Sequence, residues 1–123
     1  MCSRYTAVVC LIALAFSAPA AAQPLRKTTF VTGLTQPVAF VQDPSDPTVQ
    51  YVVQQNGLIR SIRNGALQTA PFLDLRTSIA SGGERGLLGL ALPANYAVSG
   101  RAFVYFNDMN GDCLLYTSDA ADE

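Results

Sequence analysis

The spacing of short apolar runs limits the folds open to this chain more than any other feature of its sequence. Within residues 23–112, β-branched and aromatic runs alternate with Gly, Pro, Asn and Asp, and helical periodicity is hard to find. "YVVQQ" and "LIRSI" are two such runs, and "GLLGLAL" is a nearly continuous apolar one, as expected of a strand buried on both faces. A helix over residues 86–92 is the alternative, but two glycines within seven residues disfavour it. The pattern predicts an all-β protein.

Two Asn-Gly pairs mark the turns of a meander. Asn56-Gly57 separates residues 51–55 from residues 58–62, and Asn64-Gly65 follows the second run. Asn-Gly supplies the two positive-φ positions of a type I′ turn, so we expect tight hairpins at these places.

The two halves of the chain repeat one pattern with a period of about 50 residues. Residues 37–44 and 86–93 are both apolar runs that end in proline, and residues 51–57 and 103–111 are both strand-like runs that end in Asn-Gly. This period fits a four-stranded propeller blade better than the shorter rhythm of a sandwich. The repeat predicts a first blade and about half of a second. Their strands lie near residues 37–42, 50–55, 58–63 and 71–75, and near 87–92 and 102–107.

Residues 1–22 have the features of a secretory signal peptide. Arg4 provides a positive start, residues 6–16 an apolar core, and "SAPAAA" a small-residue cleavage region that ends at Ala22. The apolar run is too short to span a membrane. We therefore expect a periplasmic or secreted protein with cleavage after Ala22.

The last eleven residues, "CLLYTSDAADE" (113–123), differ from the rest of the chain. They are small, acidic and aperiodic, at the point where the third strand of the second blade should begin. They also resemble the translation of a sequencing-library adapter. We expect residues 113–123 to be a non-native tail that supplies no complete strand; a genuine disordered terminus is the alternative.

Residues 23–112 then remain as the propeller segment. They hold seven Lys and Arg against six Asp and Glu, and none of the three cysteines, which stand at positions 2, 10 and 113. Such a segment forms no internal disulfide, and its charge balance indicates neither a nucleic-acid partner nor a membrane surface. No Ser, Cys or Lys has an evident base partner for hydrolase chemistry.

The stretch "GGERGLLGLALPANYAVSGRAFVYFND" (82–108) resembles the glucose/sorbosone dehydrogenase family, the soluble quinoprotein sugar dehydrogenases. "FVTGLTQPVAFVQDP" and "YVVQQNGLIRSIRNG" are similar to the opening blade of that family. The resemblance covers residues 29–112, and "ERGLLGLALP" is its most specific part.

This resemblance implies a six-bladed β-propeller that carries pyrroloquinoline quinone (PQQ) and calcium. It implies oxidation of an aldose or related alcohol by hydride transfer to PQQ, with a histidine as base and an electron acceptor that the sequence does not identify. The chain contains no histidine, so no catalytic base and no metal ligand are assigned here. We expect PQQ and calcium to bind the full-length parent, and the segment alone to bind neither and to be inactive.

Glu84 is the one position that the family pattern assigns to the ligand-binding face. It stands where the family has a glutamine bordering cofactor and substrate, two residues before the Gly-Leu-Leu-Gly run, and Arg85 follows it. An ion pair between Glu84 and Arg85 on a solvated loop is the alternative.

Two further alternatives stay open. Related propellers of hedgehog-interacting proteins share an "ERGLL"-type motif, which allows a non-catalytic propeller that binds a protein or glycan. "DMNGD" (108–112) spaces Asp108, Asn110 and Asp112 like the start of a calcium loop, but the Asn-Gly pair also accounts for it as a hairpin tip.

Overall fold

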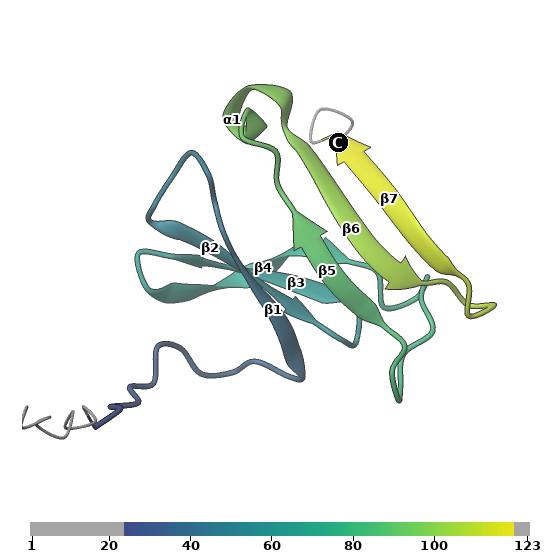
Figure 1. Ribbon diagram of the computed structural model, residues 1–123, viewed down its shortest axis with the longest axis horizontal. Coiled ribbons are helices and arrows are strands. Elements are labelled where there is room, and N and C mark those ends of the chain that lie inside the picture. Colours follow the sequence, from purple (N-terminus) through teal and green to yellow (C-terminus); the bar gives the residue numbers. More distant parts are fainter. Residues whose placement is uncertain (1–23, 120–123) are drawn as a thin grey trace, which may run out of the picture.

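A computed structural model describes residues 24–119 of the chain. It contains two antiparallel sheets and one short helix (Figure 1). The first sheet is a meander of four strands in chain order: β1 (Pro37–Gln42), β2 (Val49–Gln54), β3 (Leu58–Arg63) and β4 (Ala66–Asp74). The second sheet has the order β5 (Leu87–Ala91), β6 (Arg101–Asn107) and β7 (Cys113–Asp119), with helix α1 (Tyr96–Ser99) between β5 and β6. The all-β prediction is confirmed, and the proposed signal peptide lies outside the described residues.

The strand predictions are confirmed in position. β1 and β3 have the predicted bounds, and β2, β5 and β6 each lie within one residue of them. β4 begins at Ala66, five residues before the predicted start, and β-bulges interrupt its pairing with β3. The glycine-containing run 87–91 is a strand, because its backbone pairs with β6 and its Leu87 and Leu90 side chains are buried.

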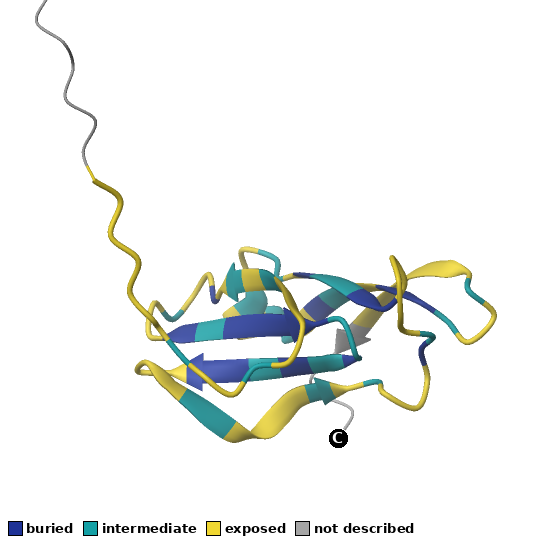
Figure 2. Ribbon diagram, turned by 90° about the horizontal axis from the view of Figure 1, so that it is seen from below, coloured by how far each residue is buried: buried dark blue, intermediate teal, exposed yellow. Residues whose placement is uncertain are grey.

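The two sheets pack face to face around one apolar core. β5 contacts both β1 and β2, so the inner strands of the sheets lie beside each other. Buried residues concentrate on β2, β3, β5 and β6, whereas β4 is largely exposed (Figure 2). The core residues are Val49, Tyr51, Val53, Ile59, Ile79, Leu87, Leu90, Ala102, Val104 and Phe106. These apolar side chains supply the main favourable free energy that joins the sheets.

The two Asn-Gly hairpins have different turns. At the second, Asn64 and Gly65 both have positive φ (50° and 76°) and Arg63 pairs with Ala66, which is the predicted type I′ arrangement. At the first, only Gly57 has positive φ (103°), and Gln54 pairs with Leu58 across a three-residue loop. The type I′ prediction is therefore wrong at Asn56-Gly57.

The first turn is longer because Gly57 also serves a tertiary contact. Its carbonyl accepts a hydrogen bond from the Leu75 amide (2.8 Å), and a Cβ at this position would lie 3.0 Å from the Arg76 backbone nitrogen. A turn with one Gly at positive φ after two ordinary residues is the common three-residue hairpin. It brings Gly57 against the chain that leaves β4.

Residues 113–119 correct one expectation about the tail. They form β7, which pairs with β6 in unbroken register from Asn107–Cys113 to Arg101–Asp119. Backbone pairing needs no particular side chains, and Leu114, Leu115 and Tyr116 suit a strand even though they stay exposed. The tail therefore does supply a third strand; whether it is native stays a prediction.

The turn between β1 and β2 is built on Asp43. Asp43 Oδ1 accepts hydrogen bonds from Ser45 Oγ (2.6 Å), Ser45 N (2.8 Å) and Asp46 N (3.1 Å), and Tyr51 Oη donates to Oδ2 (3.3 Å). Burial by itself raises the pKa of the Asp43 carboxyl, but these four donors together lower it below its ordinary value. The pKa of Tyr51 is raised, first by burial and then by its hydrogen bond with Tyr96 of α1.

Candidate functional site

Three loops meet at one end of the two sheets. They are residues 55–57 after β2, residues 75–86 before β5 and residues 108–112 after β6. Backbone contacts join them: Leu75 N donates to Gly57 O (2.8 Å), and Ile79 forms an isolated bridge with Asp108. Figure 1 shows the second and third loops on the same side of the molecule, at the lower right. This loop end is the place where the sequence predicts a ligand-bordering residue.

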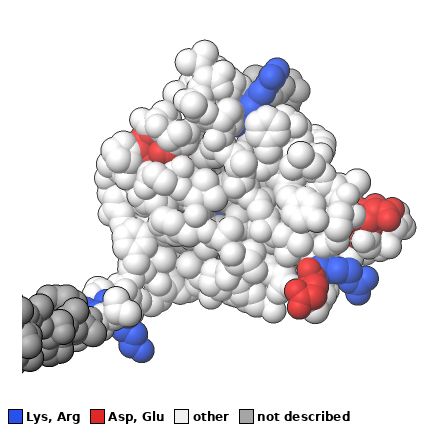
Figure 3. Space-filling view, in the orientation of Figure 1, with Lys and Arg blue, Asp and Glu red and all other residues white. Residues whose placement is uncertain are grey.

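Glu84 and Arg85 lie in the turn that leads into β5. The turn is closed by two backbone hydrogen bonds, Gly82 N to Arg85 O (3.0 Å) and Arg85 N to Gly82 O (3.2 Å). Gly82 and Gly83 have positive φ, which glycine adopts without the Cβ penalty of other residues. Glu84 and Arg85 are both exposed. On the face drawn in Figure 3, acidic and basic side chains lie next to each other at the lower right, and other charged side chains lie apart from them at the top, the upper left and the lower left.

The alternative of an ion pair between Glu84 and Arg85 is wrong. An ion pair does form in the preceding part of the same loop, where Arg76 Nη2 lies 2.6 Å from Asp74 Oδ2. Arg76 also donates from Nε to Asp74 Oδ1 (2.9 Å), and this side-chain pairing lowers the pKa of the Asp74 carboxyl. Arg85 instead extends towards Gly111. Its Nη1 lies 3.7 Å from the point that a Cβ on Gly111 would occupy. Glu84 is thus exposed and makes no ion pair with its neighbour Arg85.

Two amide side chains that the sequence analysis did not single out hold this loop. Gln55 Nε2 donates to Gly83 O (2.7 Å) and to Arg85 O (3.1 Å). Asn107, a buried residue at the end of β6, accepts the Gly86 amide at its Oδ1 (3.2 Å). Both residues look like ordinary strand-end polar residues in the sequence. The one signal that could have found them is that each directly precedes or begins a turn, where side-chain amides commonly bond backbone groups.

The "DMNGD" stretch is a hairpin tip. Asp108 Oδ1 accepts hydrogen bonds from Asn110 N and Asp112 N (both 2.9 Å), and Asp108 N donates to Asp112 O (2.9 Å). The carboxylate is thus used to close its own loop. Among residues 24–119 there is no group of three or more His, Cys, Asp or Glu side chains arranged to hold a metal ion.

Asn56 adds one polar atom that lacks a partner. Its Oδ1 is buried and accepts no hydrogen bond from the described residues. A buried acceptor left in this state costs free energy, which a donor from a further segment or a ligand would remove. The loop end thus has an exposed carboxylate at Glu84 and an unsatisfied acceptor at Asn56.

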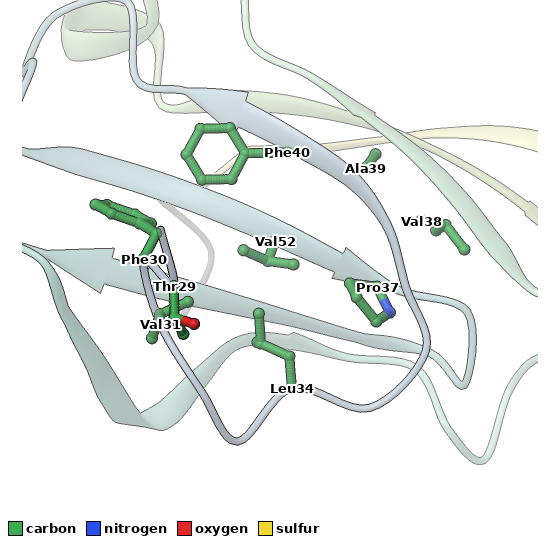
Figure 4. A pocket seen from close by; sticks show the side chains of 9 residues that line it. All are labelled: Thr29, Phe30, Val31, Leu34, Pro37, Val38, Ala39, Phe40 and Val52. Atoms are coloured by element: carbon green, nitrogen blue, oxygen red, sulfur yellow. The ribbon is translucent and has the colours of Figure 1, made fainter. Parts of the chain in front are cut away.

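An apolar groove of about 420 Å³ lies elsewhere, on the face of the first sheet that is turned away from the second (Figure 4). Phe30 and Leu34 of the preceding segment and Phe40 of β1 surround Val52 of β2. The remaining lining residues are Thr29, Val31, Pro37, Val38 and Ala39. The groove shares no residue with the three loops and has no charged lining. It has the character of a packing surface.

No family model matches the chain. Over 81 residues it is 31% identical to hedgehog-interacting protein from Mus musculus and 30% identical to that from Homo sapiens, which is 62% of this chain and 12% of each of those proteins.

Two solved structures resemble the chain more extensively. The PQQ-bound aldose sugar dehydrogenase of Streptomyces coelicolor matches 73% of this chain with a TM-score of 0.62 and 23% identity. A protein described as an oxidoreductase (glucose dehydrogenase) from Thermus thermophilus matches 76% with a TM-score of 0.62 and 29% identity. The chain has the fold of one part of these sugar dehydrogenases. It covers 26% and 27% of their lengths.

The family resemblance and the β-propeller architecture expected from the sequence are thereby confirmed. The two sheets have the strand orders expected of one four-stranded blade, β1-β2-β3-β4, and of three strands of a second blade, β5-β6-β7. No helix within the described residues has the length and apolar character that crossing a bilayer requires. The roles expected of Glu84 and Arg85 concern a ligand, and they stay predictions.

Proposed function

We propose that this chain is one part of an exported quinoprotein that oxidises an aldose sugar or a related alcohol. The observation that supports the proposal is the similarity of the two sheets to sugar dehydrogenases over about three quarters of the chain, one of them in a PQQ-bound form. In such an enzyme PQQ would accept the hydride, and calcium would be bound together with PQQ.

The loop end fits the border of a PQQ site rather than a whole one. Glu84 is exposed there and Arg85 carries a guanidinium that suits a carboxylate of PQQ. The described residues supply no group for calcium, and the chain has no histidine to take a hydroxyl proton. We therefore assign Glu84 and Arg85 to the edge of the site, and expect this chain alone to be inactive.

The test uses the complete protein that carries this segment. Purified protein is incubated with PQQ and calcium, and reduction of an artificial dye is followed with a panel of aldoses and alcohols. Turnover that requires both additions supports the proposal. Absence of PQQ-dependent turnover across the panel contradicts it.

A second candidate is a non-catalytic propeller that binds a protein or glycan. The observation that favours it is the identity of about 30% with hedgehog-interacting proteins over 81 residues. The same dye assay separates the two candidates, and a pull-down with immobilised glycans or candidate proteins would provide the positive result for the binder.

Two proposals concern the ends of the chain. We propose that residues 1–22 direct export and are removed, so that the mature protein begins at Gln23; amino-terminal sequencing of the protein from the periplasm or medium tests this.

We also propose that residues 113–123 are non-native. The nucleotide sequence tests this, since codons unlike those of the adapter would contradict it.

A further inference from the structure

The turn that carries Glu84 is rich in glycine. Three of the five residues from Gly82 to Gly86 are glycines, and all three have positive φ (125°, 60° and 149°). Glycine has the largest backbone freedom of any residue, so ordering this turn costs more conformational entropy than ordering an average loop. Contacts from outside the turn therefore add to its two internal backbone hydrogen bonds in setting the direction in which Glu84 projects.

Gln55 of the first sheet provides the contacts closest to Glu84. Its single Nε2 donates to the carbonyls of Gly83 and Arg85, the residues on either side of Glu84. The two hydrogen bonds, 2.7 and 3.1 Å long, use both protons of a side-chain amide. A carboxylate or thioether of the same length has no proton to donate, and an asparagine is one methylene shorter.

The backbone of Gln55 is fixed against the same segment. Its carbonyl accepts a hydrogen bond from Leu87 N (3.1 Å), and a Cβ on Gly86 would lie 2.3 Å from that oxygen. Asn107 holds Gly86 from the other side, through Oδ1 and through its backbone N–H, which donates to Gly86 O (3.1 Å). The turn is thus pinned at its base, and the Gln55 amide is what extends this support to its tip.

From these contacts we propose that Gln55 is a positioning residue, which orients Glu84 at the ligand-bordering edge by holding the peptide groups on both sides of it. The inference rests on the proposed function. Gln55 itself touches no reacting group; it acts through the backbone of Gly83 and Arg85. Its substitution should change how well Glu84 meets a sugar more than how well the sheets fold.

The test compares Gln55→Met with Gln68→Met. Methionine keeps the length of glutamine and removes the donors. Gln68 lies on β4 and its Nε2 donates to Ala66 O (2.9 Å), a local contact away from the three loops, so Gln68→Met is the matched control. Both variants are made in the complete protein. If Gln55→Met does not fold, Gln55→Asn replaces it, because asparagine is one methylene too short to reach both carbonyls.

Two readouts are measured. In the holoenzyme, we expect Gln55→Met to raise the KM for the sugar about tenfold with little change in kcat, since a displaced Glu84 would weaken sugar binding equally in the ground state and the transition state. In amide hydrogen exchange without sugar or PQQ, the Arg85 amide should exchange about tenfold faster in Gln55→Met than in Gln68→Met. Both changes together support the inference.

Three other outcomes would overturn the positioning role of Gln55. If Gln55→Met matches Gln68→Met in KM and in exchange, the amide does not position the turn. If turnover falls with KM unchanged, Gln55 only maintains the amount of folded enzyme. If the wild-type protein shows no PQQ-dependent turnover, the proposed function fails, and this inference with it; that failure is recognised because it is seen before any substitution is made.

Discussion

Gly86 occupies a position where the second sheet meets the backbone of the first. A Cβ there would lie 2.3 Å from Gln55 O and 2.7 Å from Gln55 Cγ, at a φ of 149°. Because one of these two atoms belongs to the backbone of Gln55, it cannot move away from a new Cβ without separating the end of β2 from the start of β5. The glycine of the "ERGLL" motif therefore serves the contact between sheets as well as the turn.

We predict that Gly86→Ala lowers the free energy of unfolding by about 3 kcal/mol, since it overpacks an interface that has no space. Gly83→Ala is the control, because Gly83 also has positive φ (60°) but a Cβ there meets nothing within 4 Å. Its cost should be about 1 kcal/mol, from backbone conformation alone. Urea unfolding followed by circular dichroism measures both, and equal losses would contradict the role of the contact.

Asp43 provides a prediction about pH. Its carboxyl pKa is lower in the folded chain than the ordinary value of 3.8, so folding favours the ionised form. The stabilisation is complete above that ordinary value and is lost as the pH falls through the lower folded-state pKa. Asp43→Asn should therefore cost about 1 kcal/mol at pH 7.

The difference in unfolding free energy between wild type and Asp43→Asn should shrink below pH 4. Urea midpoints of the two proteins between pH 3 and pH 7 provide the measurement. A difference that is constant over this range would show that the carboxylate charge is not what holds the turn.

At the scale of the elements, β5 and β7 attach to the sheet in different ways. Leu90 of β5 is 9% exposed within the core between the sheets, whereas Leu115 of β7 is 72% exposed. β7 is therefore held by its backbone hydrogen bonds to β6, with little apolar burial. An edge strand of almost any sequence can form such backbone hydrogen bonds. This explains how a tail with no alternation of apolar and polar residues forms the strand β7.

We predict that Leu90→Ala destabilises the chain by about 3 kcal/mol, through lost burial and the cavity left behind. Leu115→Ala should change the stability by less than about 0.5 kcal/mol, as expected of an exposed position. Thermal or urea unfolding of the two variants tests this. A large loss for Leu115→Ala would mean that a further layer covers β7 in solution.

At the scale of the whole molecule, the apolar groove on the first sheet is the surface that favours association with other molecules. Phe30 and Phe40 are each 57% exposed and Val38 is 46% exposed, on one side of a sheet whose other side packs against the second sheet. The two phenylalanine rings meet edge to face, with centroids 6.1 Å apart, which leaves much of each ring in contact with solvent. Contiguous exposed apolar surface of this kind promotes association.

We predict that the isolated chain associates as its concentration rises, and that Phe40→Lys shifts it towards the monomer. Leu25→Lys is the control, because Leu25 is fully exposed and does not line the groove. Sedimentation velocity at several concentrations distinguishes the variants. If both lysines act alike, added charge rather than the groove explains the change.

Local signals in the sequence determined the strands and their order. Short β-branched runs, Asn-Gly pairs and a period of about 50 residues locate β1, β2, β3, β5 and β6, because each hairpin is formed by residues close together in the chain. The same signals placed Glu84 on the loop before β5. They failed where tertiary contacts compete with local preference, as at Gly57, whose carbonyl binds Leu75.

Only the tertiary structure decided what surrounds the candidate site. Gln55 is 28 and 30 residues from the carbonyls that it holds, and Asn107 is 21 residues from Gly86, so no local pattern could pair them. Which polar side chain meets which peptide group depends on how one sheet packs on the other. The sequence by itself thus determined a propeller-like succession of strands with Glu84 in an exposed turn, and the packing of the two sheets determined what holds that turn in place.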